Sequence, residues 1–257
     1  MNELTEKEIE RLERKLQEAI DDKKSYHDLA NYHCEPIGTL CETCCCQHLN
    51  TIFLPWHRLY MVNFEEMLDE ALPYWDWTED TEKPKLWQNI RVPFKEGAQS
   101  SVPVEGLQAQ SGLVNQEDPN SLLNEPSCFR GDRSIVRRAE NVTWNTAYLK
   151  SLVRNAFQEE EYTKYNGIII SPHNIVHTTA GCEMRDTGTA SYDPIFWLNH
   201  AYVDRQLAFW EELNRLRGNT EIGTFDLMDQ KLAPFDNEKY NNVSMTIDNS
   251  QSQNVFD

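Results

Sequence analysis

Apolar residues recur at helical spacing near the start of the chain. We predict a helix over residues 5–32, because apolar side chains repeat every three or four positions and Thr5 with Glu8 forms a capping box. The repeating positions are Ile9, Leu12, Leu16 and Ile20. The stretch 26–32 continues this helix, and His33 lies just past its end.

Two more helices follow from the same periodicity. Residues 57–72 are amphipathic, and this helix is predicted to end before Pro73, since a residue that precedes proline avoids the helical conformation. Its apolar side consists of Met61, Phe64, Leu68 and Leu72. A third helix is predicted over residues 144–157.

Proline marks the start of two further helices. Ser171-Pro172 and Asp193-Pro194 each put a capping residue before a proline at the first helical position. The first of these helices is predicted to stop at Gly181 and the second to run to Arg217 and stop at Gly218.

The regions without periodicity divide the chain. Residues 79–140 are long and polar, and we interpret them as an excursion between two helical halves, not as a second domain. From residue 236 onward the chain is rich in Asn, Ser and Gln. We therefore predict one domain over residues 1–240 and an extended tail over 241–257.

Length and charge narrow the classes of partner. The chain has 257 residues, of which 39% are hydrophobic, and this is enough for a sizeable core. Its formal net charge of −18 argues against nucleic acid or an anionic membrane as a partner. The sequence also lacks a run of 18 apolar residues, so we expect no membrane span. It gives no indication of the oligomeric state.

The cysteines favour an oxidising compartment. Five of the seven cysteines lie within residues 34–46, and such clusters are more typical of secreted proteins than of cytosolic ones. The odd count leaves at least one sulfur outside intrachain disulfides. Glycosylation sequons begin at Asn141 and Asn242. We expect a secreted or extracellular protein whose signal peptide is absent from this chain.

Six of the seven histidines fall into two triplets with the spacing of metal ligands. The first is His33, His48 and His57, and the second is His173, His177 and His200; only His27 has no such setting. Residues four positions apart share a helix face, so one ion can be bound by both His173 and His177. Imidazoles from four helices would then meet inside a bundle, where metal sites are commonly built.

The ligand type favours copper. Dinuclear zinc or manganese hydrolases normally bridge their ions with Asp or Glu, whereas three neutral imidazoles per ion suit copper, the strongest binder in the Irving–Williams order. A chance clustering of core or surface histidines is the alternative, and the regularity of six residues argues against it. The predicted fold is mainly α, with a four-helix bundle core, a dinuclear copper centre and long loops.

Two longer segments resemble a known family. Residues 48–65 read HLNTIFLPWHRLYMVNFE, and residues 193–204 read DPIFWLNHAYVD. These segments are similar to the copper A and copper B signatures of type 3 dicopper proteins, which comprise tyrosinases, catechol oxidases and molluscan hemocyanins. PYWDW at 73–77 and HNIVH at 173–177 add to the resemblance, which covers about residues 1–240.

The resemblance implies a role for each motif residue. Copper A would be bound by His33, His48 and His57, and copper B by His173, His177 and His200. In the family a cysteine two residues before the second copper A ligand forms a thioether with it, so the resemblance implies a Cys46–His48 crosslink. An ordinary disulfide of Cys46 is the alternative. A disulfide of Cys45 with Cys41 or Cys34 fits the hemocyanin-like pattern.

Further residues are candidates for the site. In tyrosinases an asparagine at the position of Asn174 helps to hold a water that deprotonates a monophenol, together with a glutamate. Glu159, Glu160 and Glu161 lie upstream at a looser spacing. Thr178 is expected to line the pocket mouth. The candidates for orienting ligands or clamping helices are Arg58, Glu65, Asp76 and Asp204. Trp56, Phe196 and Trp197 are expected in the core.

Three functions fit such a centre. The favoured one is a dicopper oxidoreductase that uses dioxygen to oxidise phenols and catechols to o-quinones, as a monooxygenase or a catechol oxidase. The alternatives are a hemocyanin-type reversible oxygen carrier and a copper store. Hemocyanin units continue into a β-sandwich that covers the coppers, and this sequence stops at SQNVFD without a strand-rich domain, so we expect an accessible site or a fragment. Small catechols are the expected substrates, and the natural substrate is not predicted.

Overall fold

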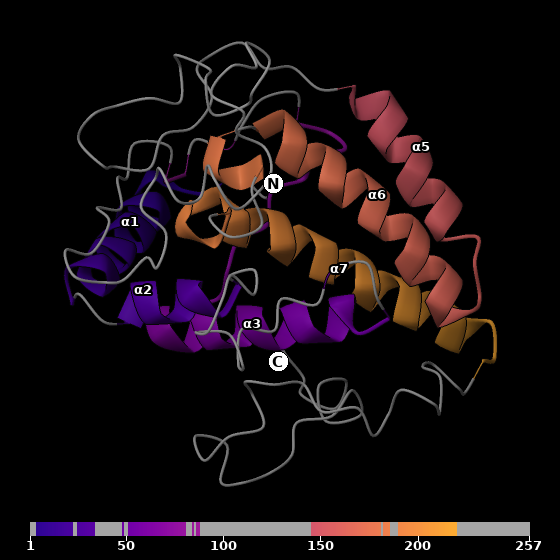
Figure 1. Cartoon of the computed structure of the whole chain (residues 1–257), viewed down its shortest axis with the longest axis horizontal. Helices are drawn as coiled ribbons and strands as arrows, with labels where there is room; N and C mark the ends of the chain where they lie inside the picture. The colour runs from indigo at the N-terminus through magenta and orange to yellow at the C-terminus, as the bar shows by residue number, and fades with distance from the viewer. Residues whose placement is uncertain are drawn as a thin grey trace, which may run out of the picture.

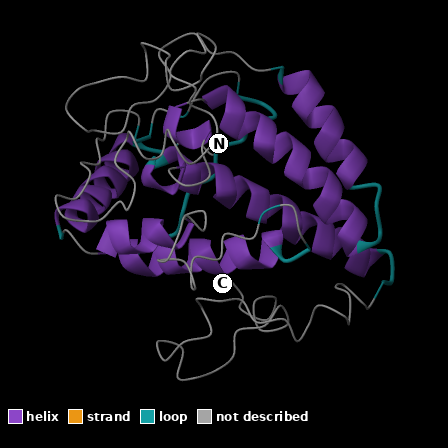
Figure 2. Cartoon of the chain, viewed as in Figure 1, coloured by secondary structure: helices purple, strands orange, loops and turns teal. Residues whose placement is uncertain are grey.

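The helices of the chain pack around a common interior. The computed structural model describes residues 4–22, 25–33, 48, 51–80, 84, 86–87, 145–180, 182–185 and 190–219. All regular elements in these ranges are helical, which confirms the mainly α prediction (Figure 2). In Figure 1, α6 (Tyr162–Ala180) and α7 (Ile195–Leu216) run side by side, and α5 (Thr146–Ala156) lies on the outer side of α6. The helix α3 (Phe53–Leu68) flanks α7 on its other side.

The first predicted helix is divided into shorter elements. The structure has α1 over Glu6–Asp21, α2 over Ser25–Ala30 and the 3-10 turn η1 over Asn31–His33. The capping box of Thr5 and Glu8 is present, but the prediction of one helix over residues 5–32 is wrong. The last turn of α1 has no basic residue and ends at Asp21 and Asp22, whose charges oppose the negative end of the helix dipole.

The predicted bounds of α3 are displaced by four residues. It begins at Phe53, with Pro55 in the first turn, where an N–H group would have no partner within the helix. It ends at Leu68 because Asp69 takes the left-handed conformation, with φ 50° and ψ 45°. Aspartate tolerates this conformation better than most residues.

The two proline signals gave opposite outcomes. The predicted start of a helix at Ser171-Pro172 is wrong, because α6 begins at Tyr162 and contains Pro172 in its interior. The predicted end before Gly181 is confirmed. For α7 both bounds agree with the prediction to within one residue: Asp193 Oδ1 accepts a hydrogen bond from the backbone N–H of Ile195 at 3.1 Å, and Gly218 follows the helix with φ 85°.

Aromatic pairs fix how α7 lies against its neighbours. Phe64 of α3 stacks on Trp197 near the start of α7, with ring centroids 4.0 Å apart. Arg58, near the start of α3, binds Glu211 near the end of α7, so the two helices are antiparallel. Tyr165 of α6 stacks on Trp210 at 4.7 Å.

The remaining short elements lie around this group. The 3-10 turns η3 and η4 cover Cys182–Arg185 and Ala190–Tyr192 between α6 and α7. Beyond α3, the described Leu86 and Trp87 are buried, whereas most of the predicted excursion over residues 79–140 and all of the predicted tail over 241–257 lie outside the described residues. None of the helices in the described ranges is long and apolar enough to span a membrane.

Candidate metal centre

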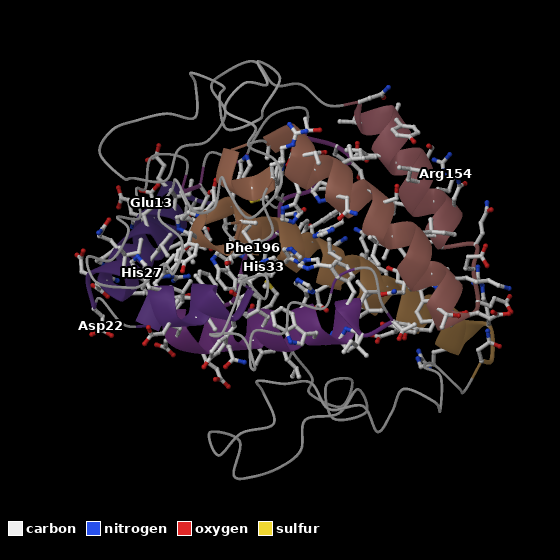
Figure 3. All side chains as sticks on the ribbon, in the orientation of Figure 1. Glu13, Asp22, His27, His33, Arg154 and Phe196 are labelled. Atoms are coloured by element: carbon white, nitrogen blue, oxygen red, sulfur yellow. The ribbon has the colours of Figure 1, made fainter. Side chains whose placement is uncertain are left out.

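Six imidazole rings converge between α3, α6 and α7. His33 ends η1, His57 lies in the second turn of α3, and His200 lies in the second turn of α7. His173 and His177 come from α6. His48 is described at a single position between segments that are not described. Figure 3 labels His33 and Phe196 in the middle of the helical body, where these elements meet.

The second triplet has the spacing of ligands around one ion. His200 Nε2 lies 3.1 Å from His173 Nε2 and 3.3 Å from His177 Nε2. Two nitrogen ligands about 2.0 Å from a tetrahedral ion are about 3.3 Å apart. The three Nε2 atoms therefore fit one metal ion.

The first triplet is closely packed but arranged differently. The ring centroids of His33, His48 and His57 lie 4.8, 5.2 and 5.3 Å apart in pairs. The ligand atoms of His33 and His57 group with His200, all within 4.8 Å of one another, and His48 is outside that group. The rings of His57 and His200 stack at 4.4 Å with an interplanar angle of 9°. The two triplets thus adjoin through this stacked pair.

Hydrogen bonds donated by Nδ1 orient three of the rings. His57 Nδ1 donates to the backbone carbonyl of Phe53 at 2.8 Å, and His177 Nδ1 donates to that of Met184 at 2.6 Å. His173 Nδ1 donates to Asn174 Oδ1 at 3.0 Å. With the proton held on Nδ1, each ring presents the lone pair of Nε2, as metal-bound histidines do. The buried His57 Nε2 has no hydrogen-bond partner in the part of the chain that the structure describes.

Burial keeps these rings neutral. It lowers the pKa of His48 and of His177 to about 4. Burial, with the neighbouring rings adding to it, also lowers the pKa of His57, His173 and His200 well below the ordinary value. A neutral imidazole is the form that binds a metal. The possible metal groups are two sets of three histidines: His33, His57 and His200, and His173, His177 and His200. Among the described residues, neither set includes a carboxylate or a cysteine, so the donor set fits copper.

Two phenylalanine rings contact the histidines of the centre. Only one of them, Phe196, was predicted from the sequence, and it was predicted as a core residue. The Phe196 ring lies 4.2 Å from His200 and 4.7 Å from His33. The Phe53 ring lies 4.5 Å from His57 and 4.9 Å from His173, so it contacts both triplets. A spacing signal was available for Phe53, because it precedes His57 by four residues on α3. The predicted core residues Trp56, Phe196 and Trp197 are all buried.

The other candidate site residues differ in exposure. Asn174 and Thr178 have exposed side chains on α6, and the Thr178 hydroxyl donates to the backbone carbonyls of Asn174 and Ile175 at 3.0 Å. The glutamates at 159–161 precede α6, and about 18 Å of helix separates them from Asn174 at 1.5 Å per residue. Cys46 lies outside the described residues, as do the predicted thioether and disulfides.

The predicted clamp residues accept hydrogen bonds from side-chain and backbone donors. Asp204 is buried and accepts a hydrogen bond from Arg58 Nε at 2.7 Å. Glu65 accepts one from the backbone N–H of Leu72 at 2.7 Å, and Asp76 accepts one from the Thr78 hydroxyl at 2.6 Å. None of these carboxylates belongs to the possible metal groups within the described ranges.

Comparison of the sequence with known families gives one clear match. The model of the common central domain of tyrosinase matches residues 23–213. Unit G of the Helix pomatia hemocyanin beta-C chain is 30% identical over an alignment 276 residues long, which covers 98% of this chain and 61% of that protein. A tyrosinase of Streptomyces glaucescens is 32% identical over 211 residues, or 71% of this chain and 70% of that enzyme. Hemocyanin 2 of Megathura crenulata is 28% identical across the whole chain, which spans 7% of its length.

Solved structures agree on the fold. A functional unit of octopus hemocyanin superposes with a TM-score of 0.65 at 23% identity, over 96% of this chain and 62% of that one. An oxygen-bound mutant of Aspergillus oryzae pro-tyrosinase gives a TM-score of 0.61 at 18% identity, over 96% and 64% of the two chains. The chain thus spans less than two thirds of these solved chains and of the hemocyanin unit.

Proposed function

Because the chain belongs to the tyrosinase family of type 3 copper proteins, we propose that it binds two copper ions and uses dioxygen to oxidise catechols and phenols to o-quinones. His33, His48 and His57 would hold copper A. His173, His177 and His200 would hold copper B. A copper pair bound by these rings supplies dioxygen binding and reversible one-electron redox chemistry.

The observation that carries the oxidase proposal is the exposure of Asn174. Its side chain is exposed while its Oδ1 atom accepts the hydrogen bond from the buried His173 ring. The Nδ1 edge of the His173 ring, which is a predicted copper B ligand, is therefore one residue away from solvent. A small aromatic ring that reached the centre would lie near Phe53 and Phe196, whose buried rings contact His173 and His200.

The same contacts suggest a preference for catechols over monophenols. A catechol has only to bind and lose its protons, whereas a monophenol needs a base to be deprotonated first. Asn174 can orient a water molecule, but the glutamates at 159–161 lie about 18 Å away along α6. We therefore expect weaker or delayed action on monophenols.

A reversible oxygen carrier is the alternative function. Hemocyanins and a tyrosinase both occur among the relatives, and the hemocyanin units match almost the whole of this chain. Carrier and oxidase would use the same six imidazoles, so the ligands do not distinguish them. Access of an organic substrate to the copper pair does.

A paired assay tests the proposal. The copper-loaded chain is assayed for steady-state oxidation of 4-methylcatechol, and the near-ultraviolet absorption that develops on oxygenation is followed in the same preparation. We expect both signals. Reversible oxygenation without catechol turnover would instead make the chain an oxygen carrier.

The Cys46–His48 thioether is a separate proposal, supported by the family motif alone. Peptide mass mapping after full reduction should give a segment 46–48 that is lighter by two hydrogens. Free alkylation of Cys46 in copper-loaded protein would rule out the crosslink.

We also propose that the protein is secreted, since the cysteine cluster and the sequons at Asn141 and Asn242 suit an oxidising compartment.

A further inference from the structure

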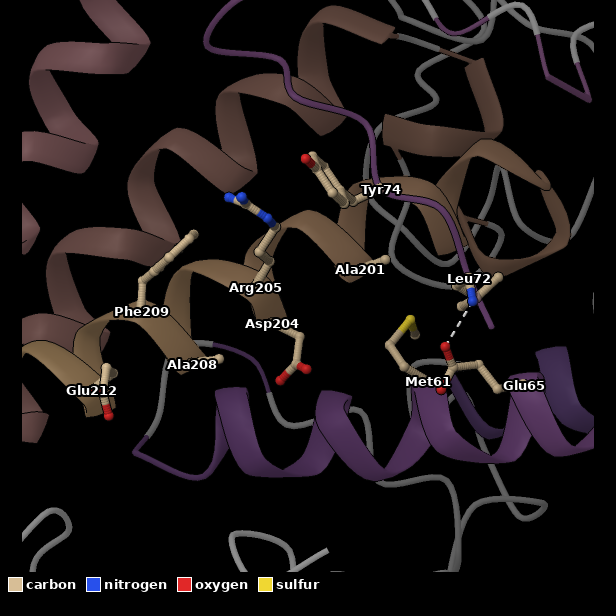
Figure 4. A pocket seen from close by; sticks show the side chains of 10 residues that line it. All are labelled: Met61, Glu65, Leu72, Tyr74, Ala201, Asp204, Arg205, Ala208, Phe209 and Glu212. Carbon is tan, nitrogen blue, oxygen red and sulfur yellow. Dashed lines mark hydrogen bonds between the residues drawn. The ribbon is translucent and has the colours of Figure 1, made fainter. Parts of the chain in front are cut away.

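A pocket separate from the metal centre opens between α3, α7 and the segment that follows α3 (Figure 4). Its volume is about 520 Å³, within the range of roughly 300–1,000 Å³ typical of small-molecule sites. None of the six candidate ligand histidines lines it. Whatever binds there would do so without touching the metal ions.

Small residues on one face of α7 form the hollow. Ala201 and Ala208 are seven residues apart on α7, so they lie on the same side of the helix, and both line the pocket. Met61 of α3 and Leu72 complete an apolar surface. This surface fits the hydrocarbon part of a ligand.

One side of the pocket is closed by aromatic rings. The Arg205 guanidinium carbon lies 4.5 Å from the centroid of Tyr74 and 4.3 Å from that of Phe209. Both distances are within the range of cation–π attraction, which holds the arginine against this wall. In Figure 4 the Arg205 guanidinium extends to the Tyr74 side, and the Asp204 carboxylate points the opposite way, to α3.

Negative charge predominates in the lining. Glu65, Asp204 and Glu212 contribute three carboxylates against the single guanidinium of Arg205, and Glu212 is paired with Arg215 outside the lining at 2.6 Å. Asp204 shares Arg58 with Glu211, so that group of three side chains has a net charge of −1. Burial raises the pKa of Glu65, and the charge of Asp204 adds to the rise. A cation would relieve the repulsion between these two carboxylates.

We propose that this pocket is a binding site for a small organic ammonium ion with an apolar or aromatic body. The ammonium group would lie at the Glu65 and Asp204 end, and the body against Leu72, Ala201 and Ala208. A small molecule is favoured over a peptide because the stacked Arg205 closes one side of the pocket. The proposal is independent of the oxidase function.

Calorimetric titration of the copper-loaded full chain with 2-phenylethylamine tests this site, and 2-phenylethanol serves as the neutral probe of the same shape. We expect the amine to bind at least tenfold more tightly than the alcohol, with and without copper. A208L, which fills the hollow, should weaken amine binding at least tenfold. A147L makes the same change at an exposed position of α5 and should leave binding unchanged.

A second variant keeps the test decisive if A208L does not fold. E65Q can still accept the hydrogen bond from Leu72 but lacks the charge, so it should weaken binding of the amine and not of the alcohol. The proposal is overturned if the amine shows no binding at millimolar concentration, if the alcohol binds equally well, or if the folded A208L and E65Q variants both keep full affinity.

Discussion

At the scale of single residues, the candidate centre depends on neutral and oriented imidazoles. Burial favours the uncharged form of His57, His173 and His200, and hydrogen bonds donated by Nδ1 leave Nε2 as the ligand atom of His57, His173 and His177. Without these bonds each ring could rotate or present the wrong nitrogen. Ring orientation therefore matters as much as the presence of the histidines.

Replacing His177 tests the copper B ligands. H177A removes one of three converging nitrogen atoms, so we expect the copper content to fall from two ions to about one per chain and the oxygenation absorption to disappear. S171A, at an exposed position of the same helix, should retain both ions and the absorption. Metal analysis and absorption spectra measure the two effects. Full absorption in H177A would refute this ligand assignment.

Acid should destabilise the metal-free chain in the range where histidine titrates. The pKa of His48 and His177 is lowered to about 4 in the folded chain, against about 6.5 when unfolded. The unfolded chain therefore binds more protons between these values, and stability falls as the pH drops from about 6.5 to about 4. Urea unfolding midpoints at pH 7.0 and 5.5 measure this effect before most carboxylates titrate. Equal midpoints would contradict it.

At the scale of the helices, a buried ion group joins the two helices that carry His57 and His200. Arg58 Nε donates to Asp204 at 2.7 Å, and its two terminal nitrogens donate to Glu211 at 3.0 and 3.1 Å. Burial alone would lower the pKa of Arg58, but the charges of Asp204 and Glu211 outweigh it and raise that pKa. The guanidinium stays charged and holds α3 against α7.

Removing Arg58 should therefore be costly. R58M leaves two carboxylates of α7 without their cation, and loss of one partner from a buried pair costs about 3–5 kcal/mol. R14M breaks the exposed Arg14–Glu18 pair of α1 and should cost less than about 0.5 kcal/mol. Urea unfolding of the two variants gives both values. Similar losses in both would show that the buried group does not clamp the helices.

The sequence predicted some helices and residues better than others, for physical reasons. Both ends of α7 carry local signals, in Asp193 and Gly218, and both were predicted. The start of α6 was missed because Pro172, which resembles a first helical residue, lies inside a helix whose stability comes from tertiary packing. The histidine triplets can be recognised as metal ligands in the sequence because polar rings at such spacing are rare. Phe53 cannot be recognised as part of the centre, because phenylalanine is also a common core residue.

At the scale of the whole molecule, the charge of the chain should influence which substrates arrive. Aspartate and glutamate number 42 against 24 lysines and arginines, and the formal net charge is −18. The summed field of such a chain attracts cations and repels anions over distances of about 10 Å at moderate salt. The neutral rings of the candidate centre do not offset it, and two bound copper ions would offset only a small part of the net charge of −18. The rate at which a charged catechol associates with the chain should thus depend on the sign of the charge on the catechol.

We predict that cationic catechols are oxidised more efficiently than anionic ones of similar size. At low salt, kcat/KM for dopamine should exceed that for 3,4-dihydroxyphenylacetate by about three- to tenfold, because the net charge of −18 favours encounter with the cation. Salt screens this field, so the ratio should fall towards the value set by intrinsic reactivity at about 1 M. Neutral 4-methylcatechol should show little change with salt. A ratio that does not respond to salt would mean that local contacts at the copper pair, and not the field of the whole molecule, decide between the two substrates.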